Sequence, residues 1–193
     1  MLASGVSMIA CSASSGQARA IAERLVGVAV PSLVLDDCWK VSLDLAIFAG
    51  AHPVVLYFFP GCSGSPDDGE RADLMDVVQH RAFRHHLPDL EARGYTVIGV
   101  SSQSDELQRR SARANRLVHR LLCDPELQLA QALELPTFSC DDAHWYQRLT
   151  LIAGKGRVEK LFFPVANAAA SASQVLTWLA LHRQPTDASD DAC

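Results

Sequence analysis

Two continuous apolar runs and a series of helical patterns divide this chain. The run Val54–Phe59, bounded by Pro53 and Pro60, is rich in β-branched and aromatic residues, and such a run predicts a strand that is buried on both faces. Tyr95–Val100 predicts a second strand of the same kind. Elsewhere apolar residues recur at the three- and four-residue spacing of amphipathic helices. The pattern therefore predicts an α/β fold with helices against a buried sheet.

The other predicted elements complete an alternating order. Pro88 interrupts one helical pattern and should kink or break that helix, because proline removes a backbone donor. Gly154–Gly156 separates two apolar segments as a hairpin turn does. The full set is a helix (16–28), a short strand (31–37), a brief helix up to 48, the strand 54–59, a helix (66–93), the strand 95–100, a helix after 104, a short strand or turn (121–125), a helix (126–133), a hairpin (148–153 and 157–163) and a last helix through 175–181.

This order of elements is that of the thioredoxin fold with an insertion. Right-handed crossovers make the two long strands parallel, and the hairpin adds antiparallel strands. We therefore expect a mixed central sheet flanked by helices. Residues 29–183 should form this domain, preceded by an N-terminal extension with a helix (1–28) and followed by a disordered acidic tail (184–193).

Composition and charge restrict the class of protein. The 193 residues are 49% hydrophobic and 20% charged, which is typical of one globular domain. The formal net charge of -5 gives no electrostatic case for binding nucleic acid. No apolar run approaches the roughly 20 residues that span a bilayer. The mildly apolar Met1–Ala10 has no Lys or Arg before it, so we expect a cytoplasmic protein without a secretory signal.

The six cysteines are scattered along the chain, with no C-x-x-C pair. This spacing disfavours both a disulfide scaffold and a zinc site. His80 and His85 on one predicted helix are five residues apart, which misses the three- or four-residue spacing of a helical metal pair. We therefore expect no metal and no cofactor.

Cys62 lies in the loop between the first buried strand and the helix after it. Ser65 supplies an N-cap oxygen for that helix, and Pro66 suits its first position. Ligands of α/β sheets gather at such places, because the free backbone N–H groups of a helix start attract anions. A thiolate needs a helix start or a nearby cation to form at neutral pH. Cys62 is therefore the candidate reactive cysteine.

Several segments together resemble the peroxiredoxins of the alkyl hydroperoxide reductase and thiol-specific antioxidant group. They span residues 29 to 182. They are the strand leading to Pro60, residues 82–84 (AFR) with 89–90 (DL), 97–101 (VIGVS), 121–125 (LLCDP), 135–138 (LPTF) and 148–151 (RLTL). The resemblance implies a peroxide substrate, thioredoxin or a low-molecular-weight thiol as reductant, and pairing into a homodimer.

The resemblance also implies a site. In peroxiredoxins the peroxidatic cysteine lies in the first turn of the helix after the strand. A Thr or Ser orients the peroxide there, and an arginine from the hairpin stabilises the thiolate. Arg148 matches that arginine. Counting back from the AFR segment places Asp76 where the nucleophile falls and Arg81 where a helix-borne resolving cysteine falls. Neither residue has a thiol.

Two hypotheses remain open. In the first, Cys62 is a displaced nucleophile that reduces hydrogen peroxide or organic hydroperoxides through a sulfenic acid. Arg148 is then its cation, and Ser65 or Ser63 the orienting hydroxyl. Cys140 is the first candidate for the resolving cysteine, and Cys123 is the second.

In the second hypothesis, the fold has lost peroxidase chemistry and serves as a tailoring enzyme or a small-molecule binding protein. The absence of cysteine from the usual position favours it. The expected pocket is the same in both cases. Besides Cys62 and Arg148, it is lined by Pro60, Ser63, Asp76 and Ser101.

Overall fold

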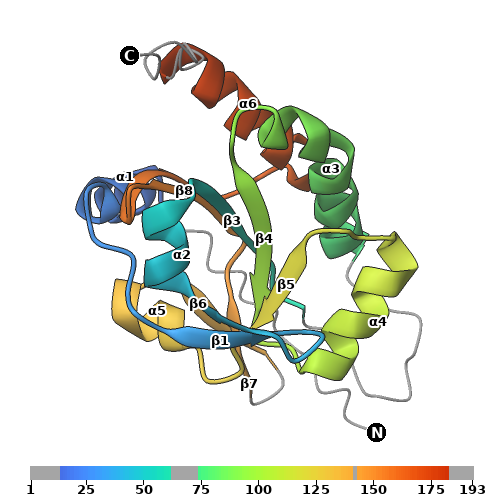
Figure 1. Cartoon of the computed structure of the whole chain (residues 1–193). Coiled ribbons are helices and arrows are strands. Elements are labelled where there is room, and N and C mark those ends of the chain that lie inside the picture. Colours follow the sequence, from blue (N-terminus) through green and yellow to red (C-terminus); the bar gives the residue numbers. More distant parts are fainter. Residues whose placement is uncertain (1–13, 62–73, 141–142, 183–193) are drawn as a thin grey trace, which may run out of the picture.

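The computed structural model describes residues 14–61, 74–140 and 143–182, which fold into three layers (Figure 1). A central sheet separates two sets of helices. One face is covered by α1 (Ser15–Leu25), α2 (Leu45–Ala51) and α5 (Gln128–Leu133). The other face is covered by α3 (Leu74–Glu91), α4 (Asp105–Asn115) and α6 (Ser171–His182), the last preceded by a 3-10 turn, Ala168–Ala170.

The sheet has seven strands in the order β2-β1-β5-β4-β3-β8-β9. Their bounds are β1 (Val34–Asp37), β2 (Ser42–Asp44), β3 (Val54–Phe58), β4 (Thr96–Ser101), β5 (Arg120–Cys123), β8 (Leu149–Gly154) and β9 (Arg157–Phe162). Strands β3, β4 and β5 are parallel, whereas β8 is antiparallel to both β3 and β9, and β1 to both β5 and β2. The predicted thioredoxin-like fold with a mixed sheet is confirmed.

Strand β3 is the centre of the core. All five of its residues are buried, and alternate residues face the two helical layers. Tyr57 faces α3 and leans over Gly99 of the neighbouring strand. A Cβ at Gly99 would lie 2.8 Å from the Tyr57 hydroxyl, so a glycine is required to seat that ring.

The predicted break at Pro88 is wrong. Helix α3 continues through Pro88 to Glu91, and the Ala92 amide still donates to the Pro88 carbonyl at 2.9 Å. Pro88 lies on the exposed side, whereas Leu87 and Leu90 on either side of it are buried. Their burial offsets the roughly 3 kcal/mol that a proline costs inside a helix. The helix ends at Glu91, and the turn after it includes Gly94, which has a φ of +78°.

Two elements were missed from the sequence. One is β2, which has only three residues. The other is a separate hairpin of β6 (Thr137–Cys140) and β7 (Ala143–Tyr146). Short strands with exposed residues carry little hydrophobic alternation, so pattern alone does not reveal them.

The predicted domain boundaries stay predictions. The expected acidic tail (184–193) and the first 13 residues lie outside the described part of the chain. Helix α1, which belongs to the predicted extension, packs on the sheet through the fully buried Leu25. The amide of Gly27, just after it, donates to the Val158 carbonyl of β9 at 2.7 Å.

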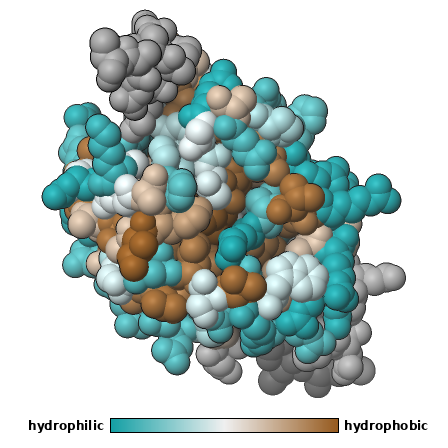
Figure 2. All heavy atoms as spheres, in the orientation of Figure 1, coloured by the Kyte–Doolittle hydropathy of each residue, from teal (hydrophilic) through white to brown (hydrophobic). Residues whose placement is uncertain are grey.

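On the face shown in Figure 2, hydrophobic side chains gather toward the middle of the view, and hydrophilic ones surround them. None of the helices in the described ranges is long and apolar enough to cross a membrane.

Candidate functional site

The carboxyl ends of the three parallel strands meet at one edge of the sheet. Gly61 follows β3, Ser101 ends β4, and Asp124 follows β5. Arg148 joins them because β8 runs antiparallel to β3, with Leu149 opposite Phe58. Helix α3 supplies Asp76 from its first turn. This edge is where α/β folds usually place a ligand.

Asp76 and Arg148 form an ion pair at the centre of this edge. The Arg148 Nη2 donates to the Asp76 Oδ1 at 2.6 Å, and Nη1 donates to the Gln79 Oε1. The Gly61 amide donates to the other carboxylate oxygen of Asp76 at 2.9 Å. Only 7% of the Asp76 side chain and 12% of the Arg148 side chain are exposed. The carboxylate is therefore held by a cation and a backbone amide in a nearly closed environment, where charge-assisted hydrogen bonds are strong.

The Gly61 backbone is itself fixed from β4. Gln103 Nε2 donates to the Gly61 carbonyl at 2.7 Å, and the Gln103 amide donates to the Ser101 Oγ at 3.2 Å. The Ser101 hydroxyl in turn donates to the Pro60 carbonyl at 3.4 Å. Gly61 has a φ of +69°, and a Cβ there would lie 2.4 Å from Gln103. Only glycine suits this position.

The structure brings four of the residues expected at the site into one network. Asp76 contacts Arg148 directly, and Pro60 and Ser101 are linked to them through Gly61. Cys62, Ser63 and Ser65 lie outside the described residues, so their expected roles stay predictions. The backbone of Cys140 lies in β6, and Cys123 lies in β5.

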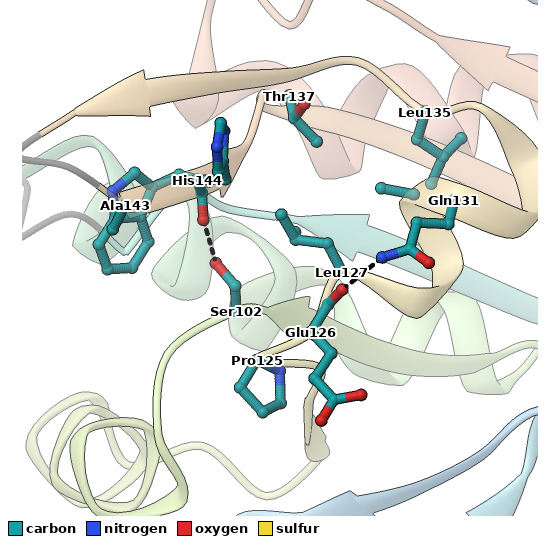
Figure 3. A pocket seen from close by; sticks show the side chains of 11 residues that line it. Ser102, Pro125, Glu126, Leu127, Gln131, Leu135, Thr137, Ala143 and His144 are labelled. Atoms are coloured by element: carbon teal, nitrogen blue, oxygen red, sulfur yellow. Dashed lines mark hydrogen bonds between the residues drawn. The ribbon is translucent and has the colours of Figure 1, made fainter.

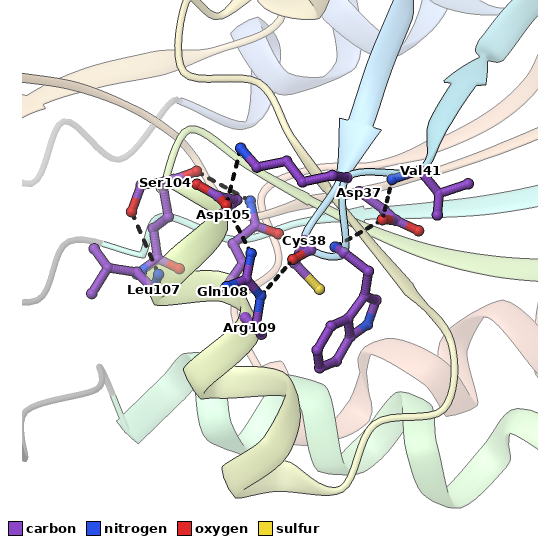
Figure 4. A network of polar contacts seen from close by, with 11 residues as sticks. Asp37, Cys38, Val41, Ser104, Asp105, Leu107, Gln108 and Arg109 are labelled. Atoms are coloured by element: carbon purple, nitrogen blue, oxygen red, sulfur yellow. Dashed lines mark hydrogen bonds and ion pairs between the residues drawn. The ribbon is translucent and has the colours of Figure 1, made fainter.

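Cys123 is poorly suited to redox chemistry. Burial, together with nearby Cys38 and acidic groups, raises the pKa of its thiol to about 12. Burial also raises the pKa of Cys38, which lies beside Arg109 in the polar network of Figure 4. The Arg109 Nε donates there to the Cys38 carbonyl at 2.9 Å. Because the thiolate is the reactive form, this environment does not favour Cys123 as a resolving cysteine.

Sequence reasoning missed Gln79 and His80. With Asp76 and Phe83, they occupy positions i, i+3, i+4 and i+7 of α3, the spacing of one helix face, and all four are buried. That spacing could have placed Gln79 and His80 beside Asp76. The sequence analysis considered His80 only as a possible metal ligand on this helix.

Three polar groups, His80, Tyr57 and His119, form a buried hydrogen-bonded line on the α3 side of the sheet. The Tyr57 hydroxyl lies 2.9 Å from His80 Nδ1 and 2.8 Å from His119 Nε2. The Tyr57 ring stacks on Phe83 with a centroid distance of 4.3 Å. Burial lowers the pKa of His80 to about 3, with smaller contributions from His119 and Arg148, and lowers that of His119 to about 4. Both imidazoles are therefore neutral at physiological pH.

These lowered pKa values predict a loss of stability in acid. The unfolded chain binds protons on both histidines below about pH 6.5, whereas the folded chain stays neutral down to about pH 4. Stability should fall as the pH drops through this window, by about 2 to 3 kcal/mol per histidine between pH 7.5 and 4.5. Urea unfolding at the two pH values measures it.

In the His119→Gln variant, the fall in unfolding free energy between pH 7.5 and 4.5 should be smaller by the contribution of one histidine. His85→Gln, which changes an exposed histidine of α3, should keep all of it. Equal pH dependence in wild type and His119→Gln would contradict a neutral buried His119.

A groove of about 630 Å³ lies between α5 and the β6–β7 hairpin (Figure 3). Ser102, which follows Ser101 in the chain, lines it and donates to the His144 carbonyl at 3.3 Å. The elements of its two walls are also joined outside the lining, where the Tyr146 hydroxyl donates to Asp124 at 2.5 Å. Asp124 also accepts from the Gln128 and Leu129 amides at the start of α5. The size is that of a small-molecule site.

No group of three or more metal-ligating side chains occurs among residues 14–61, 74–140 and 143–182. The residues at the Asp76–Arg148 site are a carboxylate and a guanidinium with amide groups, a set that suits hydrogen bonding to a polar ligand.

The sheet order, with helices on both faces, defines a thioredoxin-like fold. Solved structures of proteins with this fold cover most of the chain. Peroxidoxin BcpB from Mycobacterium tuberculosis matches 82% of this chain and 98% of its own, with a TM-score of 0.69 and 19% identity. A PrxQ mutant from Xylella fastidiosa matches 82% and 97%, with a TM-score of 0.68 and 20% identity.

A third structure, reduced Prx3 from Vibrio vulnificus in complex with hydrogen peroxide, matches 81% of this chain and 96% of its own, with a TM-score of 0.64 and 22% identity. No curated protein matches the chain. The sequence profile of the family described as Redoxin matches residues 25–176, and the chain belongs to this family. The predicted peroxiredoxin-like resemblance is confirmed.

Proposed function

We propose that this protein has lost the peroxidatic chemistry of its family and works as a repurposed tailoring enzyme or small-molecule binding protein. One observation carries the proposal. The Asp76 carboxylate lies 2.6 Å from the Arg148 guanidinium, at the position where the family resemblance expects the thiolate. A carboxylate can accept the hydrogen bonds that a thiolate would accept, but it has no sulfur to oxidise to a sulfenic acid.

The retained parts of the site support binding and proton transfer. The Asp76 carboxylate can accept a proton, as a general base does, and the Arg148 guanidinium, which stays charged, can orient a polar substrate group. The groove between α5 and the β6–β7 hairpin adds apolar walls from Leu127, Ala130 and Leu135. A small organic molecule with one hydrogen-bonding end is the substrate class that suits this combination.

A second candidate is a peroxidase that uses Cys62 with Arg148. It is favoured by the Gly61 amide, which donates to Asp76, because Cys62 is the next residue in the chain. Its thiolate would share the site with a carboxylate, and a nearby negative charge raises a thiol pKa. A peroxide substrate, thioredoxin or a small thiol as reductant, a homodimer and a cytoplasmic location stay predictions.

Peroxide turnover separates the two candidates. With hydrogen peroxide and either dithiothreitol or thioredoxin, we expect wild type and Cys62→Ser to consume peroxide at the same rate, equal to that of the reductant without protein. The physical reason is that the Asp76 carboxylate accepts from Arg148 at the place where the family resemblance expects the thiolate. Coupled oxidation of the reductant measures the rate.

Cys123→Ser serves as a control for peripheral thiol oxidation, since Cys123 holds its proton firmly. Turnover that Cys62→Ser abolishes and Cys123→Ser leaves intact, with a sulfenic acid at residue 62 in mass spectra, would reject the proposal in favour of the second candidate.

A further inference from the structure

Tyr57, His80 and His119 form a continuous hydrogen-bonded line inside the protein. Tyr57 and His80 are completely buried, and the phenol oxygen lies within 2.9 Å of a nitrogen of each imidazole. The other nitrogen of each ring, His80 Nε2 and His119 Nδ1, is also buried, and no described residue hydrogen-bonds to either. The two ends of the line are thus the two imidazole nitrogens without a described partner.

Counting hydrogens leaves two arrangements of this line. The phenol has one proton, so it donates to one imidazole and accepts from the other. If it donates to His80 Nδ1, both rings carry their proton on Nε2. If it donates to His119 Nε2, both rings carry their proton on Nδ1. In each arrangement all three groups are neutral, and the two histidines have the same tautomer.

One end of the line lies at the Asp76 site. His80 is one helical turn after Asp76 on the same buried face of α3. Its ring packs edge-on against Phe59 at 4.6 Å, two residues before Gly61, which binds Asp76. Arg148 is the charged group that acts on His80, and Asp76 acts on Tyr57, the neutral partner of His80 in the line.

The other end lies toward the surface. His119 is half-buried and precedes β5, and its chain neighbour Val118 is 81% exposed. The line therefore crosses from the Asp76 site beneath α3 to the turn between α4 and β5.

We propose that Tyr57, His80 and His119 are a proton relay between solvent at His119 and the Asp76 site. In one passage a solvent acid such as a hydronium ion gives a proton to His119 Nδ1, and His119 Nε2–H gives its proton to the Tyr57 oxygen. The Tyr57 hydroxyl gives its proton to His80 Nδ1, and His80 Nε2–H gives its proton, through a bridging water, to the Asp76 carboxylate. No electrons are exchanged, and Tyr57, His80 and His119 are each neutral before and after.

The surroundings suit such a relay. The lowered pKa values of both histidines keep them neutral, and burial together with Asp76 raises that of Tyr57, so the phenol keeps its proton. A relay that starts and ends neutral avoids placing a charge in the core, where it costs several kcal/mol. The use of the delivered proton rests on the proposed function, since a tailoring enzyme built on Asp76 needs one.

The tautomers give the first test. In ¹⁵N-labelled protein at pH 7, long-range ¹H–¹⁵N correlation spectra should show His80 and His119 neutral and in the same tautomer, both Nε2–H or both Nδ1–H. One histidine in each tautomer, or a cationic ring, would overturn the relay.

Hydrogen exchange at His80 gives the second test. The ring is fully buried, so its proton reaches solvent through the relay or through local opening of the structure. Tyr57→Phe keeps the stacking ring and removes the hydroxyl. We expect exchange at His80 to slow by about tenfold or more in this variant. Unchanged exchange in a folded Tyr57→Phe protein would assign the three groups a purely structural role.

His119→Gln interrupts the line at its half-buried end and should slow exchange at His80 in the same way. His85→Gln, on the exposed side of α3, should leave it unchanged. These measurements need no substrate and no peroxide, so their failure removes the relay alone, whereas turnover dependent on Cys62 removes the proposed function alone.

Discussion

Asp76→Cys will give this protein a peroxide-reactive thiol. The new side chain would lie where the carboxylate now accepts from Arg148 at 2.6 Å and from the Gly61 amide at 2.9 Å. It would also lie in the first turn of the 18-residue helix α3. A cation, an amide and a helix start each stabilise a thiolate. We expect reaction with hydrogen peroxide to be about 100-fold faster than in wild type. Stopped-flow kinetics and mass spectra of the oxidised thiol measure it.

Two controls make this result specific. Asp76→Ser has a similar size and no thiol, and it should show no gain. Arg148→Gln in the Asp76→Cys background should remove most of the gain, because the thiol then loses its cation. An Asp76→Cys protein that is folded but no faster than Asp76→Ser would show that this edge of the sheet no longer activates a thiol.

Arg148→Ala should destabilise the fold by about 3 to 5 kcal/mol. It leaves the Asp76 carboxylate, only 7% exposed, without its cation, and it takes away the donor to Gln79. Removing one partner of a buried pair costs more than the pair contributes, because an unpaired charge stays buried. Urea unfolding at pH 7 measures the loss.

The double variant Asp76→Ala/Arg148→Ala is the matched control. It removes both charges, so it should be more stable than Arg148→Ala alone or only slightly less. As a second control, Arg157→Ala changes an exposed arginine that donates to the Gly27 carbonyl, and it should cost less than about 1 kcal/mol. Equal losses in Arg148→Ala and Arg157→Ala would contradict the energetic role of the ion pair.

The architecture could be predicted because its central strands are long and apolar. The runs at 54–59 and 95–100 were recognisable as β3 and β4, since buried strands of this kind have no polar alternation. The sequence predicts a helix over 66–93, but it does not show that this helix stays unbroken at Pro88. Local chemistry disfavours it, and only the burial of Leu87 and Leu90 against the sheet outweighs that cost.

The site was predictable in part. Arg148 and Asp76 were found from their place relative to recognisable segments, and the structure puts them in contact. Their support from Gly61 and Gln103 was not predictable, because it depends on a loop and a strand end that are 42 residues apart. The Tyr57–His119 contact joins residues 62 apart, and the hydrophobic pattern places Tyr57 in a buried strand but says nothing of His119.

The positive φ of Gly61 has a consequence for recognising similar proteins. The donor to Asp76 is the main-chain amide of Gly61. Every residue type except proline has such an amide, but only glycine fits at this position, so the glycine is the sequence signal of the donor. Genomes should therefore be searched for a glycine after the strand combined with an acidic residue at the helix start. A search for cysteine at the nucleophile position would pass over every relative that has made the same exchange.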